Sequence, residues 1–263
     1  MVNWTLKSSY NCKDLENVVR ILRHPGGCPW DQEQTHQSIR RNFLEETYEV
    51  AEAIDSGDVD ALKEELGDVL LQVYFHTSIE EDAGRFTLDD VADGVCKKLI
   101  YRHPHVFGDV TVDSTDQILS NWEELKKKEK HQNTQADAVD AVARTLPALW
   151  RAEKMKKKAA KAGFDWRDVS GALDKLSEEL GELKAAALEG GGDPVEELGD
   201  LLFAAVCVGR FLEADPEDAL HAACDKFSAR FRKVEELAAE RGLKLDELSD
   251  EDQIGLWNEA KRH

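Results

Sequence analysis

Several features that would mark a secreted, membrane or nucleic-acid-binding protein are missing from this sequence of 263 residues. No uninterrupted apolar run is long enough to span a bilayer, and the first residues lack the apolar segment of a signal peptide. Lysine and arginine number 34 against 54 acidic residues, which gives a formal net charge of −20 at pH 7. A protein that binds a nucleic-acid backbone needs a basic surface. We therefore expect a soluble protein whose partners include neither a membrane nor a nucleic-acid polymer.

Cysteine, proline and aromatic residues are also scarce. The five cysteines form no CxxC pair, so we expect reduced thiols and a cytoplasmic location rather than a disulfide framework. There are only 6 prolines and 7% aromatic residues. No stretch alternates polar and apolar residues for long enough to build a sheet. The remaining composition, rich in leucine, alanine, glutamate and lysine, predicts an all-α fold.

What the sequence does contain is an internal repeat. The string EELGD occurs at 64–68 and again at 196–200, each time before an apolar segment. Each copy follows an acidic stretch, FLEETYEVAEAI (43–54) in the first half and LSEELGELKAAA (176–187) in the second. The turn-forming segments DSGD and EGGGDP join the members of each pair. This order predicts two antiparallel helical hairpins, whose second helices begin near Val59 and Pro194.

The segments that follow the hairpins also correspond. The matched positions are Lys98 with Lys226, Arg102 with Arg230, and Trp122 with Trp257. Duplication explains this order better than chance does. We therefore predict two domains of the same type, residues 1–130 and 140–263, with their boundary in the polar, lysine-rich stretch 126–140.

The acidic stretches place carboxylates three residues apart. A pair with this spacing projects from nearly the same helix face, and packing of the two helices would bring two pairs together. Clustered anions repel unless a cation binds, and an all-oxygen site suits Mg²⁺ or Mn²⁺. A single acidic pair is usually a solvated helix face, but this compound pattern occurs twice. The candidate metal ligands are Glu46, Glu49, Glu65 and Asp68 in the first half, and Glu179, Glu182, Glu197 and Asp200 in the second.

A glycine also recurs at one repeat position, as Gly67 and Gly199. Glycine costs about 1 kcal/mol relative to alanine inside a helix. We expect a close approach by the facing helix or by a ligand at this position, although tight core packing alone would also explain the glycine.

With these motifs the sequence resembles the MazG family of nucleoside triphosphate pyrophosphohydrolases, whose hallmark is EExxE followed by ExxD across a helical hairpin. The resemblance covers nearly the whole chain and includes four further strings, GGCPWDQEQTH (26–36), YRHPHVFGD (101–109), LPALWRAEKM (146–155) and GFDW (163–166). It implies helical hairpins that homodimerisation completes into four-helix bundles. It also implies that nucleoside triphosphates, ATP among them, are hydrolysed between the α- and β-phosphates to a monophosphate and pyrophosphate, with Mg²⁺ held by the carboxylates.

The same resemblance implies individual roles in the second half. Lys175, Lys226, Phe227 and Arg230 are expected to contact the substrate, and Trp257 to enclose the nucleotide. The candidate catalytic residues are Glu178, Glu179, Lys226 and Arg230, with the part played by Glu178 left open. In the first half Asn42 stands where the second half has Lys175. We therefore expect the second half to be the main catalyst and the first to be weaker, differently selective or structural.

Other metal sites are conceivable. Glu33-x-x-His36 and Asp218-x-x-His221 have the spacing of a motif from di-iron bundles, but the two pairs occupy non-equivalent places in the halves. His103-x-His105 could bind a transition metal, although the proline between the two histidines favours a turn.

Two further alternatives concern the CPWD segment and the class of function. CPWD favours an ordered loop over a catalytic cysteine, with Asp31 as a helix N-cap. The alternative function is a non-catalytic, nucleotide-binding helical interaction module, which would leave the clustered carboxylates unexplained.

Overall fold

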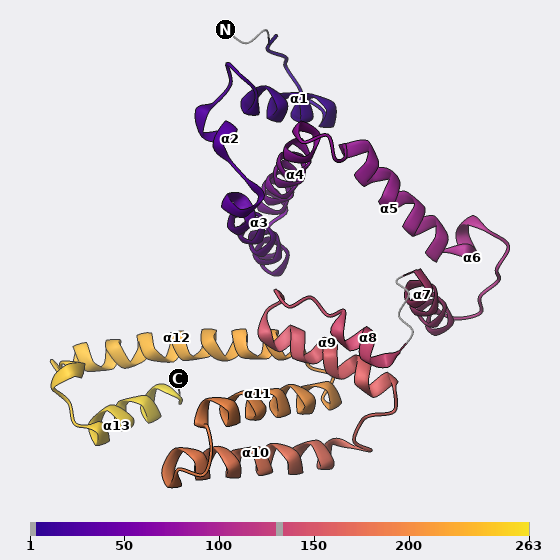
Figure 1. Ribbon diagram of the computed structural model, residues 1–263. Coiled ribbons are helices and arrows are strands. Elements are labelled where there is room, and N and C mark those ends of the chain that lie inside the picture. The colour runs from indigo at the N-terminus through magenta and orange to yellow at the C-terminus, as the bar shows by residue number, and fades with distance from the viewer. Residues whose placement is uncertain (1–3, 130–133, 263) are drawn as a thin grey trace. The chain divides into compact units, whose positions relative to one another are not determined.

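The computed structural model describes residues 4–129 and 134–262, and every regular element within these ranges is a helix (Figure 1). The predicted all-α class is confirmed. The chain divides into two compact units, one ending at Leu125 and the other beginning at Lys126. Of the predicted boundary stretch 126–140, residues 130–133 lie outside the described residues.

The first unit consists of a long helical hairpin with shorter helices before and after it. Its helices are α1 (Cys12–Arg23), α2 (Pro29–Glu33), α3 (His36–Ser56), α4 (Val59–Asp82), α5 (Leu88–Arg102), α6 (Pro104–Phe107) and α7 (Thr115–Glu129), the last of which continues past the boundary.

The second unit also contains a long hairpin. Its elements are α8 (Gln135–Asp140), α9 (Ala148–Lys161), α10 (Val169–Glu189), α11 (Pro194–Phe211), α12 (Pro216–Glu240), a 3₁₀ turn (Leu245–Glu247) and α13 (Asp250–Ala260). In this unit α10 packs against α11, α11 against α9, and α12 against both α9 and α13.

Local signals in the sequence set the turns of both hairpins. α3 ends in Gly57, whose φ of 70° suits a residue without a Cβ, and the side chain of Asp58 caps the first turn of α4. α10 ends in Gly190 with φ 76°, and Asp193 caps α11, which begins at Pro194. The predicted starts of the second helices are therefore confirmed. The first turn is tighter than predicted, because α3 continues through Ser56.

Small clusters of apolar side chains hold each unit together. In the first unit α1 packs on α4, and Val19, Ile39, Tyr74 and Phe75 form the core. In the second unit α13 packs on α12 through a core of Val234, Leu237, Ala238, Leu256 and Ala260, with Trp257 at its edge. Burial of such side chains is the main contribution to the stability of the helices.

The GFDW segment is anchored by a buried lysine. Lys156 of α9 donates a hydrogen bond to the carbonyl oxygen of Phe164 at 3.2 Å, and its Nζ lies 4.1 Å from the centroid of the Trp166 ring. Asp165 lies 3.6 Å from the same Nζ and also accepts a hydrogen bond from Arg210 of α11. These contacts give the segment a structural role, because they fix the loop that leads into α10.

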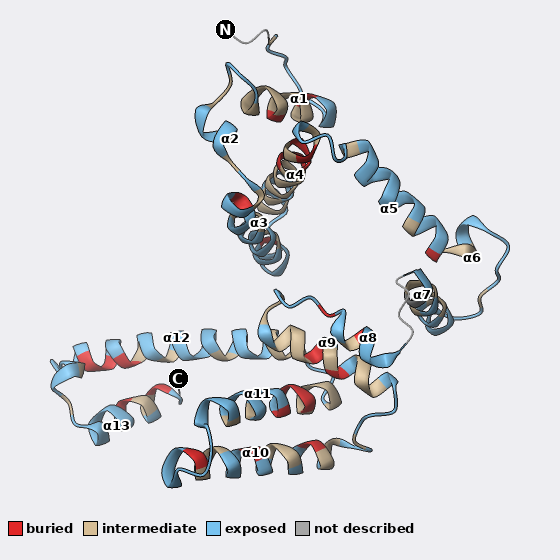
Figure 2. Cartoon of the chain, viewed as in Figure 1, coloured by how far each residue is buried: buried red, intermediate tan, exposed pale blue. Residues whose placement is uncertain are grey.

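Much apolar surface is exposed. Figure 2 shows pale blue along most of α5 and much of the hairpins. In α10 and α11 the exposed side chains include Leu180, Leu198, Leu202 and Phe203. Among the described residues, no helix is both long and apolar enough to cross a membrane.

Two local predictions need correction. Neither a facing helix nor tight core packing explains Gly67 and Gly199, because a Cβ built at either position has no described atom within 4 Å beyond its own helix backbone, and a close approach by a ligand there stays a prediction. Both glycines lie on exposed parts of their helices. Asp31 is not an N-cap, because α2 begins at Pro29 and Cys28 holds the cap position. Asp31 instead lies in the first turn, where its charge is favourable to the helix dipole.

Candidate active site

The α10–α11 hairpin brings three acidic side chains together. Glu179, Glu197 and Asp200 each place one carboxylate oxygen within 4.8 Å of the other two. Glu179 is buried, Glu197 is half-buried and Asp200 is exposed. The fourth predicted ligand, Glu182, is exposed and lies outside this group. Its pKa is nevertheless raised, first by a hydrogen bond with Glu179 and then by desolvation and the charge of Glu197.

A lysine is paired with this cluster. Lys175 Nζ lies 2.8 Å from Oε1 of Glu178 and 2.7 Å from Oε1 of Glu179. The two carboxylates raise the pKa of the lysine well above its ordinary value, so it stays charged. Lys175 is therefore an internal counterion to the buried Glu179, and it connects three of the predicted site residues.

The α3–α4 hairpin forms a second cluster with a different membership. Here the grouped carboxylates belong to Glu46, Glu49 and Glu65, again within 4.8 Å of one another. Asp68 lies outside the group, yet its charge contributes to the raised pKa of both Glu46 and Glu65, for which desolvation is the largest cause.

The first cluster differs from the second in its counterions. Within the described ranges, no lysine, arginine or histidine pairs with any of its three carboxylates or with Asp68. Asn42 occupies the position of Lys175, and the nearby Arg41 pairs instead with Glu45 at 2.8 Å. Desolvation is the largest cause of the raised pKa values of Glu46 and Glu65, and the charges of the neighbouring carboxylates add to it.

The predicted substrate-binding residues of the second half lie on α12 and α13. The rings of Phe227 and Trp257 are 5.2 Å apart, and Phe227 also stacks on Phe231 at 6.1 Å. Lys226 is exposed and Arg230 is half-buried, and neither makes an ion pair or hydrogen bond with a described residue. Among the described residues, no ion pair or hydrogen bond joins any of these side chains to the carboxylates of the α10–α11 hairpin.

The corresponding side chains in the first unit, Arg102 and Trp122, pack against each other. Arg102, at the position of Arg230, is 7% exposed, and its guanidinium lies 5.2 Å from the centroid of the Trp122 ring. A buried, stacked arginine is poorly placed to meet a phosphate. This difference separates the two halves more sharply than the substitution of Asn42 alone.

The alternative metal sites find no support in the structure. In the parts of the chain described, the two carboxylate clusters are the only groups of three histidine, cysteine or acidic ligand atoms close enough to share an ion. His36 contacts His76 and Glu80 instead of Glu33, which is exposed. Nδ1 of His103 donates a hydrogen bond to the carbonyl oxygen of Leu99, 2.6 Å away, and the His103 ring is 5.7 Å from that of His105.

Sequence reasoning missed one polar network. Glu80 of α4 is 7% exposed, and it accepts hydrogen bonds from His36 and from Arg85. Those contacts lower the pKa of Glu80 to about 2, with Arg85 as the larger cause. The i,i+4 spacing of His76 and Glu80 was visible in the sequence, but nothing local indicated that His36 would lie against both.

The carboxylate clusters are suited to a hard divalent cation. Their donors are all oxygen atoms, without the sulfur or imidazole ligands that favour zinc or copper. A bound cation relieves repulsion of this kind. Desolvation is the largest cause of the raised pKa values of Glu46 and Glu65, and a hydrogen bond with Glu179 is the largest for Glu182, while the charges of neighbouring carboxylates contribute to all three.

Comparison with known proteins places this architecture in a family. The MazG nucleotide pyrophosphohydrolase domain matches residues 34–107, which include the whole α3–α4 hairpin. The nucleoside triphosphate pyrophosphohydrolase/pyrophosphatase MazG of Thermotoga maritima is 44% identical over 252 residues, covering 95% of each chain. The nucleoside triphosphate pyrophosphohydrolase of Escherichia coli K12 is 42% identical over 252 residues, which are 94% of this chain and 96% of that one.

A third relative has a different length. The uncharacterized protein YabN of Bacillus subtilis is 50% identical over 252 residues, which make up 94% of this chain but 51% of YabN. The near-complete coverage of two full-length relatives is decisive. The chain belongs to the MazG nucleotide pyrophosphohydrolase family.

Proposed function

We propose that this protein hydrolyses nucleoside triphosphates between the α- and β-phosphates, giving a nucleoside monophosphate and pyrophosphate, and that the second half is the main catalyst. The observation that carries the proposal is the convergence of Glu179, Glu197 and Asp200 across the α10–α11 hairpin. The names of the Thermotoga maritima and Escherichia coli relatives support the reaction class. Two MazG-type domains, residues 1–130 and 140–263, remain part of the proposal.

Mg²⁺, or Mn²⁺ in its place, is the proposed cofactor. Glu179, Glu197 and Asp200 would hold it, with Glu182 moving in from its exposed position beside Glu179. When bound, such an ion supplies charge neutralisation for the phosphates and lowers the pKa of a coordinated water. Glu178 lies beside the same lysine as Glu179, so it is the protein group best placed to accept a proton near the cluster.

The protein's cations complete the chemistry. A triphosphate carries about four negative charges, and bond breaking moves charge onto the leaving pyrophosphate. Lys226 and Arg230 lie four residues apart on α12, where their charges can stabilise that group. Neither is engaged by a described residue, so both remain available to an anion. The paired rings of Phe227 and Trp257 offer an apolar surface for the nucleotide.

The proposed active form is a homodimer. Within the described part of the chain, no ion pair or hydrogen bond joins α12 or α13 to the carboxylate cluster, and the hairpin leaves Leu180, Leu198, Leu202 and Phe203 exposed. A two-helix layer needs a facing layer to bury such side chains. A second copy of the chain would supply that layer and would bring a further set of basic side chains to each hairpin.

Product identification tests the reaction. The protein should convert each accepted triphosphate to monophosphate and pyrophosphate with Mg²⁺ or Mn²⁺, and a chelator should stop it. Glu197→Gln should abolish turnover, whereas Glu196→Gln, a change at the exposed neighbour outside the cluster, should not. Release of orthophosphate as the first product would refute the proposed cleavage site. Nucleotide binding without any turnover would favour the alternative, a non-catalytic interaction module.

A further inference from the structure

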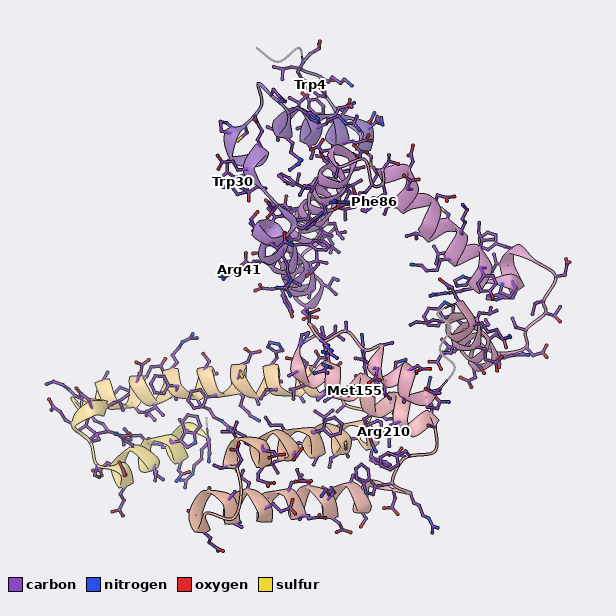
Figure 3. All side chains as sticks on the ribbon, in the orientation of Figure 1. Trp4, Trp30, Arg41, Phe86, Met155 and Arg210 are labelled. Carbon is purple, nitrogen blue, oxygen red and sulfur yellow. The ribbon has the colours of Figure 1, made fainter. Side chains whose placement is uncertain are left out.

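The first unit contains a cavity that the proposed function does not use. It has a volume of about 600 Å³ and lies between α3, α4 and the start of α5. Apolar side chains form most of its wall, among them Phe43, Val73, Phe86 and Val91. Figure 3 shows Phe86 where the chain passes from α4 to α5. A cavity of this size, mostly apolar with a few polar groups, has the character of a small-molecule site.

A hydrogen-bonded relay fixes one polar group in this cavity. Arg85 and His36 both donate to the buried carboxylate of Glu80, the arginine through Nη2 at 2.7 Å and the histidine through Nε2. Nδ1 of His36 lies 2.7 Å from Nδ1 of His76. When His36 is neutral and donates through Nε2, its Nδ1 has to accept, so His76 donates through Nδ1. Nε2 of His76 is then an acceptor, and it has no partner among the described residues.

Several observations agree with a neutral, fixed His76. Burial is the largest cause of the lowered pKa of its ring. The ring is stacked on that of His36 at 5.0 Å and meets Phe43 edge-on at 5.7 Å. A rigid acceptor in an apolar cavity is suited to the N–H groups of a nucleotide base.

A free cation lies at the edge of the same cavity. Arg40 lines it, is exposed, and makes no hydrogen bond or ion pair with a described residue. The adjacent Arg41 does not line the cavity, and it does have a partner. It pairs with Glu45, its side chain is 87% exposed, and it points away from the hairpin (Figure 3). Arg40 is therefore available to an anionic ligand in the cavity, whereas Arg41 is a natural control.

The polar groups of the cavity are absent from the second unit. Aligning Glu46 with Glu179 and Glu65 with Glu197 matches each cavity position on α3 or α4 with a residue of α10, of α11 or of the end of α11. In this register the residues at the positions of His36, Arg40, His76 and Glu80 are Val169, Leu173, Val208 and Leu212. The first unit thus has four polar side chains where the second has four apolar ones. A helical hairpin can form with apolar residues at these positions, so the polar residues are not needed for the fold.

The cavity and the first carboxylate cluster lie on the same two helices, α3 and α4. Arg40, Phe43 and Glu46 follow one another at intervals of three on α3, and Glu65 and Val73 lie eight residues apart on α4. Arg40 precedes Glu46 by six residues, about 9 Å along the helix axis. An extended nucleotide can therefore place its base against His76 and its phosphates, with a divalent cation, toward Glu46, Glu49 and Glu65.

We propose that the first unit is a second nucleotide site, in which the cavity holds the base, His76 accepts a hydrogen bond from it, and Arg40 and the cation-loaded carboxylates hold the phosphates. The stacked Arg102 and Trp122 leave this site without the basic and aromatic set of the second half. It therefore binds a nucleoside triphosphate without efficient hydrolysis. This proposal rests on the proposed function for the ligand class but not for the chemistry.

Histidine ring signals of the full-length chain test the site directly. The chain carries Glu197→Gln to suppress turnover, and ATP, GTP, CTP and UTP are titrated separately with Mg²⁺. His36→Val and His76→Val identify the two ring resonances. At least one nucleotide should shift the His76 signal in a saturable way. Arg40→Leu, which installs the residue of the second unit, should weaken this binding about tenfold or more. Arg41→Leu should change it less than about twofold.

The possible outcomes separate the two proposals. Absence of any saturable shift at His76 with all four nucleotides, in a chain that remains helical by circular dichroism, would overturn the second site. A shift that is equally sensitive to Arg40→Leu and Arg41→Leu would also overturn it, because binding would then follow general charge. If Arg40→Leu alters the sedimentation of the protein but leaves nucleotide affinity unchanged, another copy of the chain covers the cavity and the proposal fails. Turnover of the wild-type chain, measured in parallel, tests the proposed function independently.

Discussion

Lys175 and Glu179 form an ion pair across one turn of α10, with 2.7 Å between Nζ and Oε1. Glu179 is the buried member of the carboxylate cluster, so this lysine neutralises the charge that is costliest to keep inside the hairpin. The first hairpin has Asn42 at the same position, and no described basic residue pairs with its clustered carboxylates. The carboxylate cluster of the second hairpin therefore has a lysine counterion, whereas that of the first has no partner among the described basic residues.

Lys175→Met should separate metal binding from catalysis. Without the lysine, the cluster is more negative, so Mn²⁺ alone should bind about two- to fivefold more tightly. Catalysis should move the other way, with kcat/KM falling about 10- to 100-fold because the triphosphate loses a cation. Calorimetric Mn²⁺ titration and steady-state kinetics measure both. Weaker Mn²⁺ binding together with normal kinetics would mean that Lys175 only stabilises the helix.

Matched changes in the two clusters test the division of labour. Glu197→Gln and Asp200→Asn remove ligand charge with little change in volume, and should reduce kcat by at least about 100-fold. Glu65→Gln and Asp68→Asn make the same changes in the first half, where we expect less than about a fivefold effect. Steady-state assays, with circular dichroism as the folding control, decide the matter. Loss of turnover only in the first-half variants would reverse the assignment.

Arg230 and Arg232 of α12 can be compared directly, because they carry the same charge and differ in burial. Arg230→Ala should lower kcat/KM about 10- to 100-fold, since this half-buried cation is proposed to meet the triphosphate. Arg232→Ala removes the same charge from an exposed position two residues later, and should change kcat/KM less than about twofold. Equal effects would indicate that only the net charge of α12 matters.

The first cluster should make metal-free stability depend on pH. Glu46 has a folded-state pKa raised above its ordinary 4.5, with desolvation as the largest cause, so the folded protein binds more protons than the unfolded chain. Its contribution is then present at low pH and is lost as pH rises through the raised pKa. Glu46→Gln should raise the Tm of the metal-free protein by about 1–3 °C at pH 8.

Two controls accompany this measurement. The difference between Glu46→Gln and wild type should shrink toward zero as the pH falls to about 4, where the glutamate is protonated. With saturating Mg²⁺, the Tm of Glu46→Gln should fall below that of the wild type, since the variant has lost a metal ligand. Glu52→Gln, on the same helix but outside the cluster, should shift Tm by less than about 1 °C at any pH. A destabilised Glu46→Gln protein at pH 8 without metal would contradict the prediction.

The exposed apolar side chains predict the assembly. Sedimentation should give twice the chain mass of 29.5 kDa. Leu202→Glu places a charge on the exposed apolar face of α11, and should shift the equilibrium toward monomer and reduce turnover. Leu6→Glu, on the extended segment before α1, is the control for added charge and should do neither. A fully active wild-type monomer would refute the proposed homodimer.

Short-range signals made much of the fold predictable. Gly57 and Asp58, and likewise Asp193 and Pro194, determine where one hairpin helix ends or the next begins. These effects act within one or two helical turns, so the residues that cause them lie close together in the sequence and can be recognised there. The three-residue spacing of Glu46 and Glu49 likewise belongs to the helix itself. The all-α class, the two hairpins and the candidate carboxylates therefore followed from the sequence by itself.

Only the tertiary structure decided how these elements meet. It grouped Glu49 with the first cluster but left its counterpart Glu182 outside the second, because the rotation of each helix and its side-chain rotamers depend on packing. It left Gly67 facing open space, and it joined His36 to Glu80 across 44 residues. Contacts of that range depend on the whole arrangement of the hairpin and α5. Local propensity does not predict such contacts, because it reflects interactions between near neighbours in the chain, whereas packing depends on neighbours in space.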